Sequence, residues 1–128
     1  MRALKYIELK PGYSDNGPAW IGRVTQSRTG RTVYFNGRSL KAMGGRGVSG
    51  GNYYDLETGE EFWVSGVKKD GRDRHWAGNG KILVEAAALA EYLEVVGANA
   101  LDGSSHEVTY SVVETDITKF ERMENTSR

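Results

Sequence analysis

Hydrophobic and polar residues alternate along much of the first half of the chain, and a period of two is typical of strands. This pattern predicts a first strand over 6–10, which a Pro-Gly pair ends. β-Branched and aromatic residues favour two further strands over 19–24 and 32–36. The residues between them, 26–30, have the composition of a hairpin turn with glycine in a left-handed conformation.

A second hairpin of the same plan is predicted in the middle of the chain, with Thr58-Gly59 in its turn. The predicted segments here are strands over 52–56 and 61–67, a charged turn over 68–73, and shorter strands around 74–76 and over 81–84. We therefore expect strands joined by turns, with little helix, up to residue 84.

The periodicity changes from two to between three and four at residue 86. Apolar side chains recur at these spacings over 86–96, with Glu91 and Glu94 on the opposite side, and Gly97 is placed to end a helix. This predicts an amphipathic helix over 86–96, which must pack one side on the sheet.

Residues 98–128 are predicted to form an extension made of a strand and a short helix. Alternation over 107–114 predicts the strand, and 116–124 predicts one or two helical turns with Ile117 and Phe120 facing inward. The tail, 125–128, is expected to be frayed.

These elements predict a single domain over residues 1–128, because the length lies in the usual range for one core. Several short antiparallel strands with one amphipathic helix indicate an α+β protein that is mainly antiparallel β. A small, partly open barrel or a curved sheet fits this pattern, and an SH3-like barrel is one form of it.

Composition narrows the classes of function. The chain has no cysteine, which excludes disulfides and thiolate metal sites. Charges interrupt every apolar run near the N-terminus, so a secretory signal is not expected there. No run approaches the roughly 20 apolar residues that cross a bilayer. We therefore expect a cytoplasmic protein that does not enter the membrane.

The formal net charge of zero hides two differently charged parts. Residues 1–80 hold 13 Lys and Arg against 8 Asp and Glu, whereas residues 81–128 hold 4 against 9. The basic part also holds 10 of the 13 aromatic residues and 15 of the 17 glycines. A basic, aromatic, β-rich surface is typical of proteins that bind nucleic acid or another anion.

A glycine-rich segment over 44–51 contains a G-x-G-x-x-G pattern from Gly45 to Gly50. A dinucleotide site needs a strand before this pattern and a helix after it, but here a strand is predicted to follow. A P-loop is excluded as well, because no Gly-Lys-Ser/Thr sequence ends the segment. We expect a mobile connector, with contact of Arg46 to an anionic ligand as the alternative.

Alternation within the hairpins places aromatic side chains on an outer face. If Val33 and Phe35 point inward, Tyr34 points outward, and the same argument places Tyr53 and Trp63 outside. Exposed rings next to cations form a platform for single-stranded nucleic acid, because bases stack on the rings and phosphates pair with the cations. The cations expected beside these rings are Arg23, Arg31, Lys68 and Lys69. The alternative is that the C-terminal helix or strand covers this face and makes it a second core layer.

The densest group of chemically active side chains lies between residues 68 and 76. Its members are Lys68, Lys69, Asp70, Arg72, Asp73, Arg74, His75 and Trp76. Four cations with a tryptophan suit nucleic acid, two carboxylates with a histidine suit a metal, and His75 suits acid or base chemistry. No metal or catalytic site is assigned, because no further ligand follows at a definite spacing, and an exposed charged turn is the simplest interpretation. His106 is interpreted as a loop residue.

Four segments of the chain resemble a family of small bacterial proteins of unknown function. They are 17–24 (GPAWIGRV), 30–37 (GRTVYFNG), 54–60 (YDLETGE) and 73–78 (DRHWAG), and the resemblance spans residues 5–97. It implies a bacterial, intracellular, single-domain protein and brings no activity, catalytic residue or binding residue with it. Residues 98–128 lie outside the shared part.

The sequence thus predicts a non-enzymatic binding module without a cofactor, whose basic aromatic face engages nucleic acid or another anionic partner. The predicted binding residues are Arg23, Arg31, Tyr34, Arg46, Tyr53, Trp63, Lys68, Lys69, Arg72, Arg74, His75 and Trp76. One alternative is a protein-interaction or homo-oligomeric subunit, in which Tyr34, Tyr53 and Trp63 form the interface. A less favoured alternative is a small hydrolase that uses His75 with Asp73 or a distant carboxylate.

Overall fold

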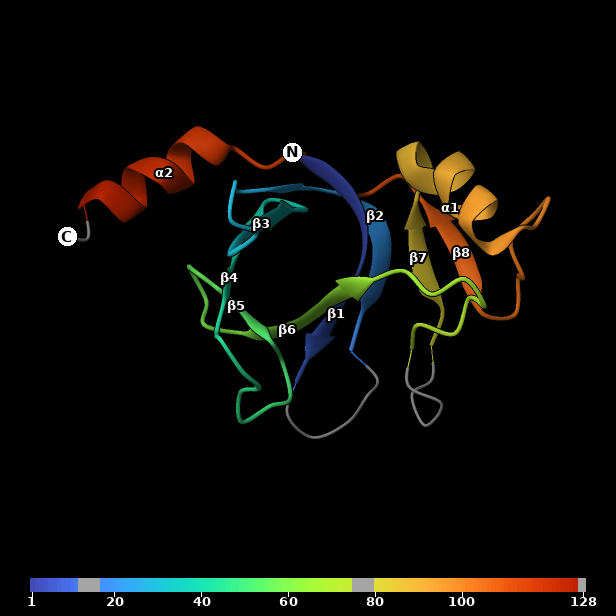
Figure 1. The fold of residues 1–128 in the computed structure, drawn as a ribbon, viewed down its shortest axis with the longest axis horizontal. Coiled ribbons are helices and arrows are strands. Elements are labelled where there is room, and N and C mark those ends of the chain that lie inside the picture. The colour runs from blue at the N-terminus through green and yellow to red at the C-terminus, as the bar shows by residue number, and fades with distance from the viewer. Residues whose placement is uncertain (12–16, 75–79, 127–128) are drawn as a thin grey trace.

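The computed structural model describes residues 1–11, 17–74 and 80–126, and its centre is a barrel of six antiparallel strands (Figure 1). The strands are β1 (Arg2–Lys10), β2 (Ala19–Gln26), β3 (Thr32–Phe35), β4 (Arg38–Ala42), β5 (Tyr53–Asp55) and β6 (Glu61–Gly66). They are ordered β1-β6-β5-β4-β3-β2, and the pairing of β1 with β2 closes the ring. The prediction of a mainly β protein built on a small barrel is confirmed.

Strand β1 closes the barrel because it pairs along both of its edges. Residues 2–8 are in antiparallel register with β2, and residues 5–10 are in antiparallel register with β6. The other barrel strands follow one another in the chain, each antiparallel to the next. The ring therefore depends on a single long-range pairing, that of β1 with β6, because every other pairing in the barrel joins consecutive strands.

Two further strands extend the sheet beyond the barrel. β7 (Ile82–Glu85) pairs with the first half of β2, and β8 (His106–Thr109) pairs with β7. Both of these pairings are parallel, whereas the barrel strands pair antiparallel, so the described sheet is mainly antiparallel, as predicted. Parallel neighbours need a crossover connection, and η1 (Ala86–Ala88) with α1 (Leu89–Val96) provides it. The predicted 86–96 helix is thus confirmed, and it ends at Gly97 with a left-handed φ of 69°.

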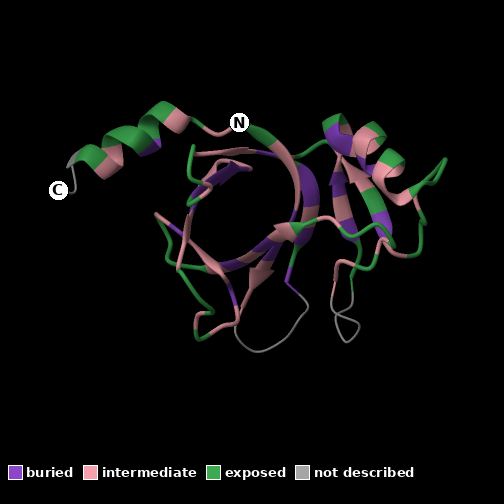
Figure 2. Cartoon of the chain, in the orientation of Figure 1, coloured by how far each residue is buried: buried purple, intermediate pink, exposed green. Residues whose placement is uncertain are grey.

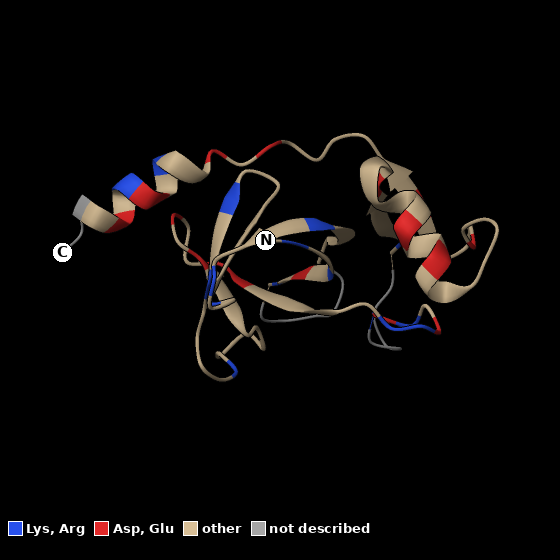
Figure 3. Cartoon of the chain, turned by 45° about the horizontal axis from the view of Figure 1, so that its top comes forward, with Lys and Arg blue, Asp and Glu red and all other residues tan. Residues whose placement is uncertain are grey.

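The chain builds two hydrophobic cores that share the wall formed by β1 and β2 (Figure 2). The first fills the barrel and contains Ile7, Val24, Val33, Phe35, Leu40, Phe62 and Val64. The second joins the outer side of the wall to β7 and α1 and contains Tyr6, Ala19, Ile21, Ile82, Val84 and Tyr92. Helix α1 turns its acidic side toward solvent (Figure 3). Successive residues of the wall therefore alternate between two buried sites instead of between core and solvent.

Strand β4 is absent from the prediction. It follows Asn36 and Gly37, which both have positive φ angles, 52° and 77°, and Phe35 pairs with Arg38 across this two-residue turn. An Asn-Gly pair between alternating residues is the strongest short-range signal for a hairpin. The signal for β4 is therefore present in the sequence.

The C-terminal segment folds back over the barrel. Strand β8 ends at Thr109, earlier than predicted, and residues 110–116 lead to the barrel end without regular structure (Figure 1). The backbone N–H of Gly37 donates to Thr115 Oγ1 (2.8 Å), and that of Val113 donates to Asn36 Oδ1 (3.0 Å). These two bonds hold the segment at the β3–β4 turn.

Helix α2 (Ile117–Thr126) ends the described chain and buries Phe120, as predicted. It includes residues 125 and 126, whereas 127–128 lie outside the described residues, so the fraying expected over 125–128 stays a prediction. The short strand expected around 74–76 also lies mainly outside them.

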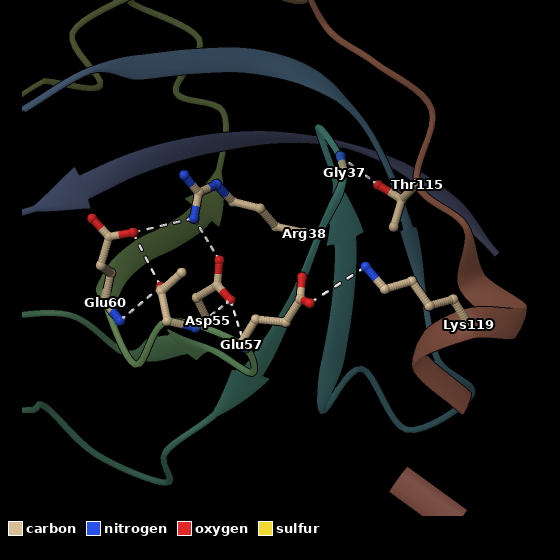
Figure 4. Close-up of polar contacts among 8 residues, drawn as sticks. Gly37, Arg38, Asp55, Glu57, Glu60, Thr115 and Lys119 are labelled. Carbon is tan, nitrogen blue, oxygen red and sulfur yellow. Dashed lines mark hydrogen bonds and ion pairs between the residues drawn. The ribbon is translucent and has the colours of Figure 1, made fainter. Parts of the chain in front are cut away.

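A polar cluster next to the C-terminal segment fixes the 56–60 turn (Figure 4). Oδ1 of the buried Asp55 accepts hydrogen bonds from the backbone N–H groups of Glu57 (2.8 Å) and Thr58 (3.1 Å). Oδ2 accepts a bond from Arg38, whose guanidinium also reaches Glu60 (3.3 Å). These bonds compensate the desolvation of the Asp55 carboxylate.

We predict that Gly22→Ala destabilises the barrel. A Cβ at residue 22 in β2 would lie 2.4 Å from Cε1 of Phe35, whose ring packs inside the barrel against Trp20. Overpacking of this kind costs about 1–3 kcal/mol, so the free energy of unfolding in urea should fall by about that amount.

The matched control is Gly66→Ala, at the end of β6, where no atom lies within 4 Å of an added Cβ. Its free energy of unfolding should equal or slightly exceed that of the unchanged protein. Equal losses for the two substitutions would show that the ring of Phe35 is not the cause.

Candidate functional site

A pocket of about 840 Å³ opens beside α1. Helices α1 and α2 lie at opposite ends of the molecule (Figure 1). We name this pocket the α1 pocket. Its walls come from α1, the 70–74 loop, the start of β7 and the 98–106 connection. Apolar surface is supplied by Leu93, Val96 and Leu101, and positive charge by Arg72, Arg74 and Lys81. Its volume lies in the range of small-molecule sites.

A chain of hydrogen bonds crosses the base of the α1 pocket. His106, at the start of β8, is buried, with Nε2 3.0 Å from the Tyr92 hydroxyl and Nδ1 2.7 Å from Ser105 Oγ. Ser105 Oγ donates in turn to the carbonyl oxygen of Asp102 (3.3 Å). Because a hydroxyl has one proton, this direction requires Nδ1–H to donate to Ser105 and Tyr92 to donate to Nε2.

This arrangement engages both nitrogens of the imidazole. Burial lowers the pKa of His106, against a smaller opposing effect of the Asp102 carboxylate, so the ring is neutral at neutral pH. Burial, with the carboxylates of Asp73 and Asp70, raises the pKa of Tyr92 to about 12, so its hydroxyl keeps its proton. A neutral ring whose only lone pair accepts a tyrosine hydroxyl does not suit the role of general base.

The cationic rim of the α1 pocket comes mainly from the 68–74 loop. Arg72 and Lys81 are exposed, and the backbone N–H of Arg72 donates to Asp70 Oδ1 (2.9 Å), which shapes the turn. Lys68 and Lys69 are exposed on the same loop. This loop lies close to α1 (Figure 3), where a Cβ at Gly71 would lie 3.4 Å from the Tyr92 hydroxyl.

A buried polar network ties the loop to the barrel wall. Arg74 places Nη2 3.1 Å from the carbonyl oxygen of Gly17 and Nη1 4.0 Å from Glu8 Oε2. Glu8 is buried on β1, where the Tyr6 hydroxyl donates to Oε1 (2.6 Å) and Lys10 Nζ lies 3.2 Å from Oε2. Burial, the hydrogen bond to Glu8 and its negative charge raise the pKa of Tyr6, so the phenol stays a donor. The position of the loop therefore depends on β1.

Two of the predicted site residues, His75 and Trp76, lie outside the described residues. Asp73, the carboxylate considered as a partner of His75, accepts a hydrogen bond from the backbone N–H of Lys68 (2.7 Å), and its pKa is raised by burial. The binding role of His75 and Trp76 and the hydrolase alternative stay predictions.

The tyrosines of the expected aromatic face are not exposed. Tyr34 points outward from β3, as predicted, but α2 packs over it and only 8% of it is exposed. Tyr53 points inward, because it lies opposite the inward-facing Phe62, and its hydroxyl donates to the carbonyl oxygen of Gly30 (2.9 Å). The prediction of an exposed platform is wrong for both tyrosines, and for Tyr34 the alternative of a covering C-terminal helix is the one observed.

Trp63 points outward, as predicted, and is half-buried against the second core. The guanidinium of Arg46 lies 5.0 Å from the centre of its ring, a cation–π contact. The glycine-rich segment that carries Arg46 is bonded to β6, since Glu61 Oε1 accepts the backbone N–H groups of Ser49 and Gly51, both at 3.0 Å. This segment is therefore held at two points instead of forming the free connector that we expected.

The other predicted cations lie on separate parts of the surface. Arg23 donates from Nε to Glu91 Oε1 (2.8 Å), and Arg31 is exposed just before β3. Among the predicted cations that the structure describes, Arg72 and Arg74 of the 68–74 loop are the ones that line the α1 pocket. The single basic face expected from the sequence is thus divided.

Tyr92, Lys81 and His106 belong to the α1 pocket and are absent from the predicted site. The parallel pairing of β7 with β8 places His106 opposite Ile82 and brings its ring to α1, with the two ring centres of Tyr92 and His106 5.5 Å apart. Local periodicity carries no signal for that pairing. The one available signal is a polar-tipped Tyr92 on the buried side of the helix.

Within residues 1–11, 17–74 and 80–126, no three His, Asp or Glu side chains gather closely enough to hold a metal ion. No helix in this part of the chain combines the length and apolar character needed to cross a membrane.

Comparison of the chain with family models, with curated proteins and with solved structures gives no significant match. The resemblance to small bacterial proteins stays a prediction, and the function has to be argued from the site itself.

We predict that His106 titrates below its ordinary pKa of about 6.5 in the folded protein. Since folding lowers this pKa, the unfolded chain binds more protons in mildly acidic solution. The contribution of His106 to stability is therefore fully present above about pH 6.5 and is lost as the pH falls toward the folded pKa. Nuclear magnetic resonance titration of the ring and urea unfolding across this pH range measure the two effects.

The matched variant is His106→Gln, which keeps a donor and an acceptor without titrating. Its stability should vary less between pH values on either side of about 6.5 than that of the unchanged protein. The difference between the two proteins isolates His106 from His75. A His106 pKa above about 6.5 would contradict the prediction.

Proposed function

We propose that the protein is a non-enzymatic binding module that takes an anionic ligand in the α1 pocket. The observation that carries this proposal is the meeting of three cations, Arg72, Arg74 and Lys81, around a pocket with an apolar side. Guanidinium and ammonium groups bind phosphate and carboxylate by charge-assisted hydrogen bonds. Arg74 is also bonded to the wall, so Arg72 and Lys81, both exposed, are the groups best placed to meet a ligand.

The two carboxylates that line the pocket are engaged within the chain. Asp102 Oδ1 accepts hydrogen bonds from the backbone N–H (3.0 Å) and the hydroxyl (2.6 Å) of Ser104, and these bonds lower its pKa. Asp70 Oδ1 accepts the backbone N–H of Arg72. An anionic group therefore finds its favourable contacts on the side of Arg72 and Lys81, and the apolar side is left for the body of the ligand.

Single-stranded nucleic acid is the anionic partner that the composition favours. A phosphate would meet the cations, while an unstacked base would lie against the apolar side of the pocket. Lys68 and Lys69 continue the positive charge along the loop for neighbouring phosphates. A duplex keeps its bases stacked, so it would use the cations without the pocket.

The finer predictions from the sequence remain proposals. The pairing of β2 with β3 only at Thr25 and Gln26, and of the first half of β2 with β7, supports a relationship to SH3-like, partly open barrels. A non-enzymatic role is supported by His106, whose two nitrogens are both engaged.

We predict that a fluorescein-labelled single-stranded oligonucleotide binds the protein in anisotropy titrations, with an affinity that falls steeply as salt rises, because bound counterions are released. Changing Arg72→Gln together with Lys81→Gln should weaken binding at low salt by about tenfold or more, the loss expected for charge-assisted hydrogen bonds.

The matched control removes the same charge elsewhere, by Arg28→Gln with Arg31→Gln; both side chains are exposed between β2 and β3, outside the α1 pocket. This pair should change the affinity much less than the pocket pair. Competition by adenosine monophosphate would show that the pocket itself is occupied, and competition by inorganic phosphate alone would restrict the ligand to the anionic group. No binding of any of these anions at low salt would overturn the proposed function.

A further inference from the structure

A second surface with the character of a binding site lies on the outer side of β3 and β4. Thr32, Tyr34, Ser39 and Lys41 share this side, because Thr32 pairs with Lys41 and Tyr34 pairs with Ser39 across the two strands. We name these four residues the β3–β4 face. Intervening residues of the same strands, such as Leu40, point into the barrel.

Helix α2 contacts the β3–β4 face through an ion pair, and it buries an aromatic side chain on the same side of the helix. Phe120 is only 1% exposed. Glu124 Oε2 lies 2.6 Å from Lys41 Nζ, which also donates to Thr32 Oγ1 (3.0 Å). At the edge of the contact, Lys119 Nζ lies 3.3 Å from Glu57 Oε2 (Figure 4). The contact therefore combines apolar burial with charge complementarity.

The contacting residues of α2 follow helical spacing. Ile117, Phe120 and Glu124 are three and four residues apart, so they lie on one side of the helix. Amphipathic helices are recognised in grooves through side chains at these spacings. In α2 these side chains include the buried Phe120 and the ion-paired Glu124. The side chains of α2 thus indicate which kind of helix the β3–β4 face binds.

The β3–β4 face is polar, unlike either core. Thr32, Tyr34 and Ser39 are all buried, and Ser39 Oγ has no hydrogen-bond partner in the described part of the chain. A hydroxyl that is buried permanently normally has a hydrogen-bond partner. An unsatisfied hydroxyl under a covering helix is what we expect of a surface whose occupant exchanges.

Attachment of α2 is weaker than the pairing of the strands. Within residues 1–11, 17–74 and 80–126, no backbone hydrogen bond joins α2 to a strand. The segment that leads to it is held by the two bonds at Gly37 and Asn36. A helix of ten residues has little stability alone, so undocking and unwinding of α2 are coupled.

We propose that the β3–β4 face is a docking site for an amphipathic helix with an aromatic anchor and a glutamate one turn after it, and that α2 is its intramolecular occupant. A partner protein that carries such a helix replaces α2 on the face. Because residues 110–116 keep α2 tethered, it competes at a high effective concentration and restrains partner binding. This proposal does not depend on anion binding in the α1 pocket.

The test uses the full chain and a fluorescein-labelled peptide of residues 114–126 as the incoming helix. A Phe120→Ala protein, whose α2 has lost its anchor, should bind this peptide at least about tenfold more tightly than the unchanged protein does. Adding Lys41→Glu to the Phe120→Ala protein should abolish the gain, because the peptide then meets a like charge. A peptide that carries Phe120→Ala should bind neither protein.

Circular dichroism and urea unfolding check that each variant keeps the barrel. If Phe120→Ala prevents folding, Lys119→Glu combined with Glu124→Lys releases α2 differently, because it reverses both ion pairs and leaves the anchor in place. Arg72→Gln with Lys81→Gln should leave peptide binding unchanged, which separates this face from the α1 pocket.

Two results would overturn the proposal. The first is equal peptide binding by the unchanged and released proteins, or binding that survives Lys41→Glu. The second is a concentration-dependent dimer of the unchanged protein, detected by light scattering and abolished by Phe120→Ala. The occupant would then be α2 of a second copy of this chain.

Discussion

Strand β1 is buried on both of its sides over residues 6–8, and the rest of the molecule is arranged around that constraint. Tyr6 and Ile7 are adjacent and both almost completely buried, but they belong to different cores. A shift of one residue in the register would exchange the two sides and place Glu8 on the barrel side, where Ile7 now packs in the first core. The carboxylate of Glu8 therefore specifies the register of β1, and through it the positions of β2, β6 and α1.

The same carboxylate connects the fold to the candidate site. A buried charge is tolerated when it is paired and hydrogen-bonded, and Glu8 finds its partners in Tyr6, Lys10 and the approaching Arg74. Arg74 belongs to the loop that carries Arg72 to the rim of the α1 pocket. Arg72 therefore lies at the pocket partly because Arg74, two residues later, pairs with the buried Glu8 of the barrel wall. The loop sequence alone does not place it there.

Local patterns predicted the elements whose partners are close in sequence. Both hairpins and both helices followed from periodicity, and the Asn36-Gly37 turn carried the signal for β4 as well. Contacts between distant segments carried no such signal. Alternation could not show whether Tyr53 points into the barrel, because that depends on its pairing with Phe62. Nor could it show that His106 reaches α1, because that depends on the pairing of β8 with β7. The sequence accordingly predicted the loop cations Arg72 and Arg74 of the candidate site. It did not predict the hydrogen-bonded Tyr92, His106 and Ser105 at the bottom of the pocket.

A closed barrel has no free strand edge, but the extension by β7 and β8 creates one. No strand in the described part of the chain pairs with the outer edge of β8. That edge is only four residues long and carries the exposed Glu107, and shortness and charge both discourage edge-to-edge association. The extension also joins segments far apart in sequence, which form contacts more slowly than hairpins do. During folding, the risk of intermolecular strand pairing is therefore concentrated at β7 and β8, before α1 and the C-terminal segment have packed in place.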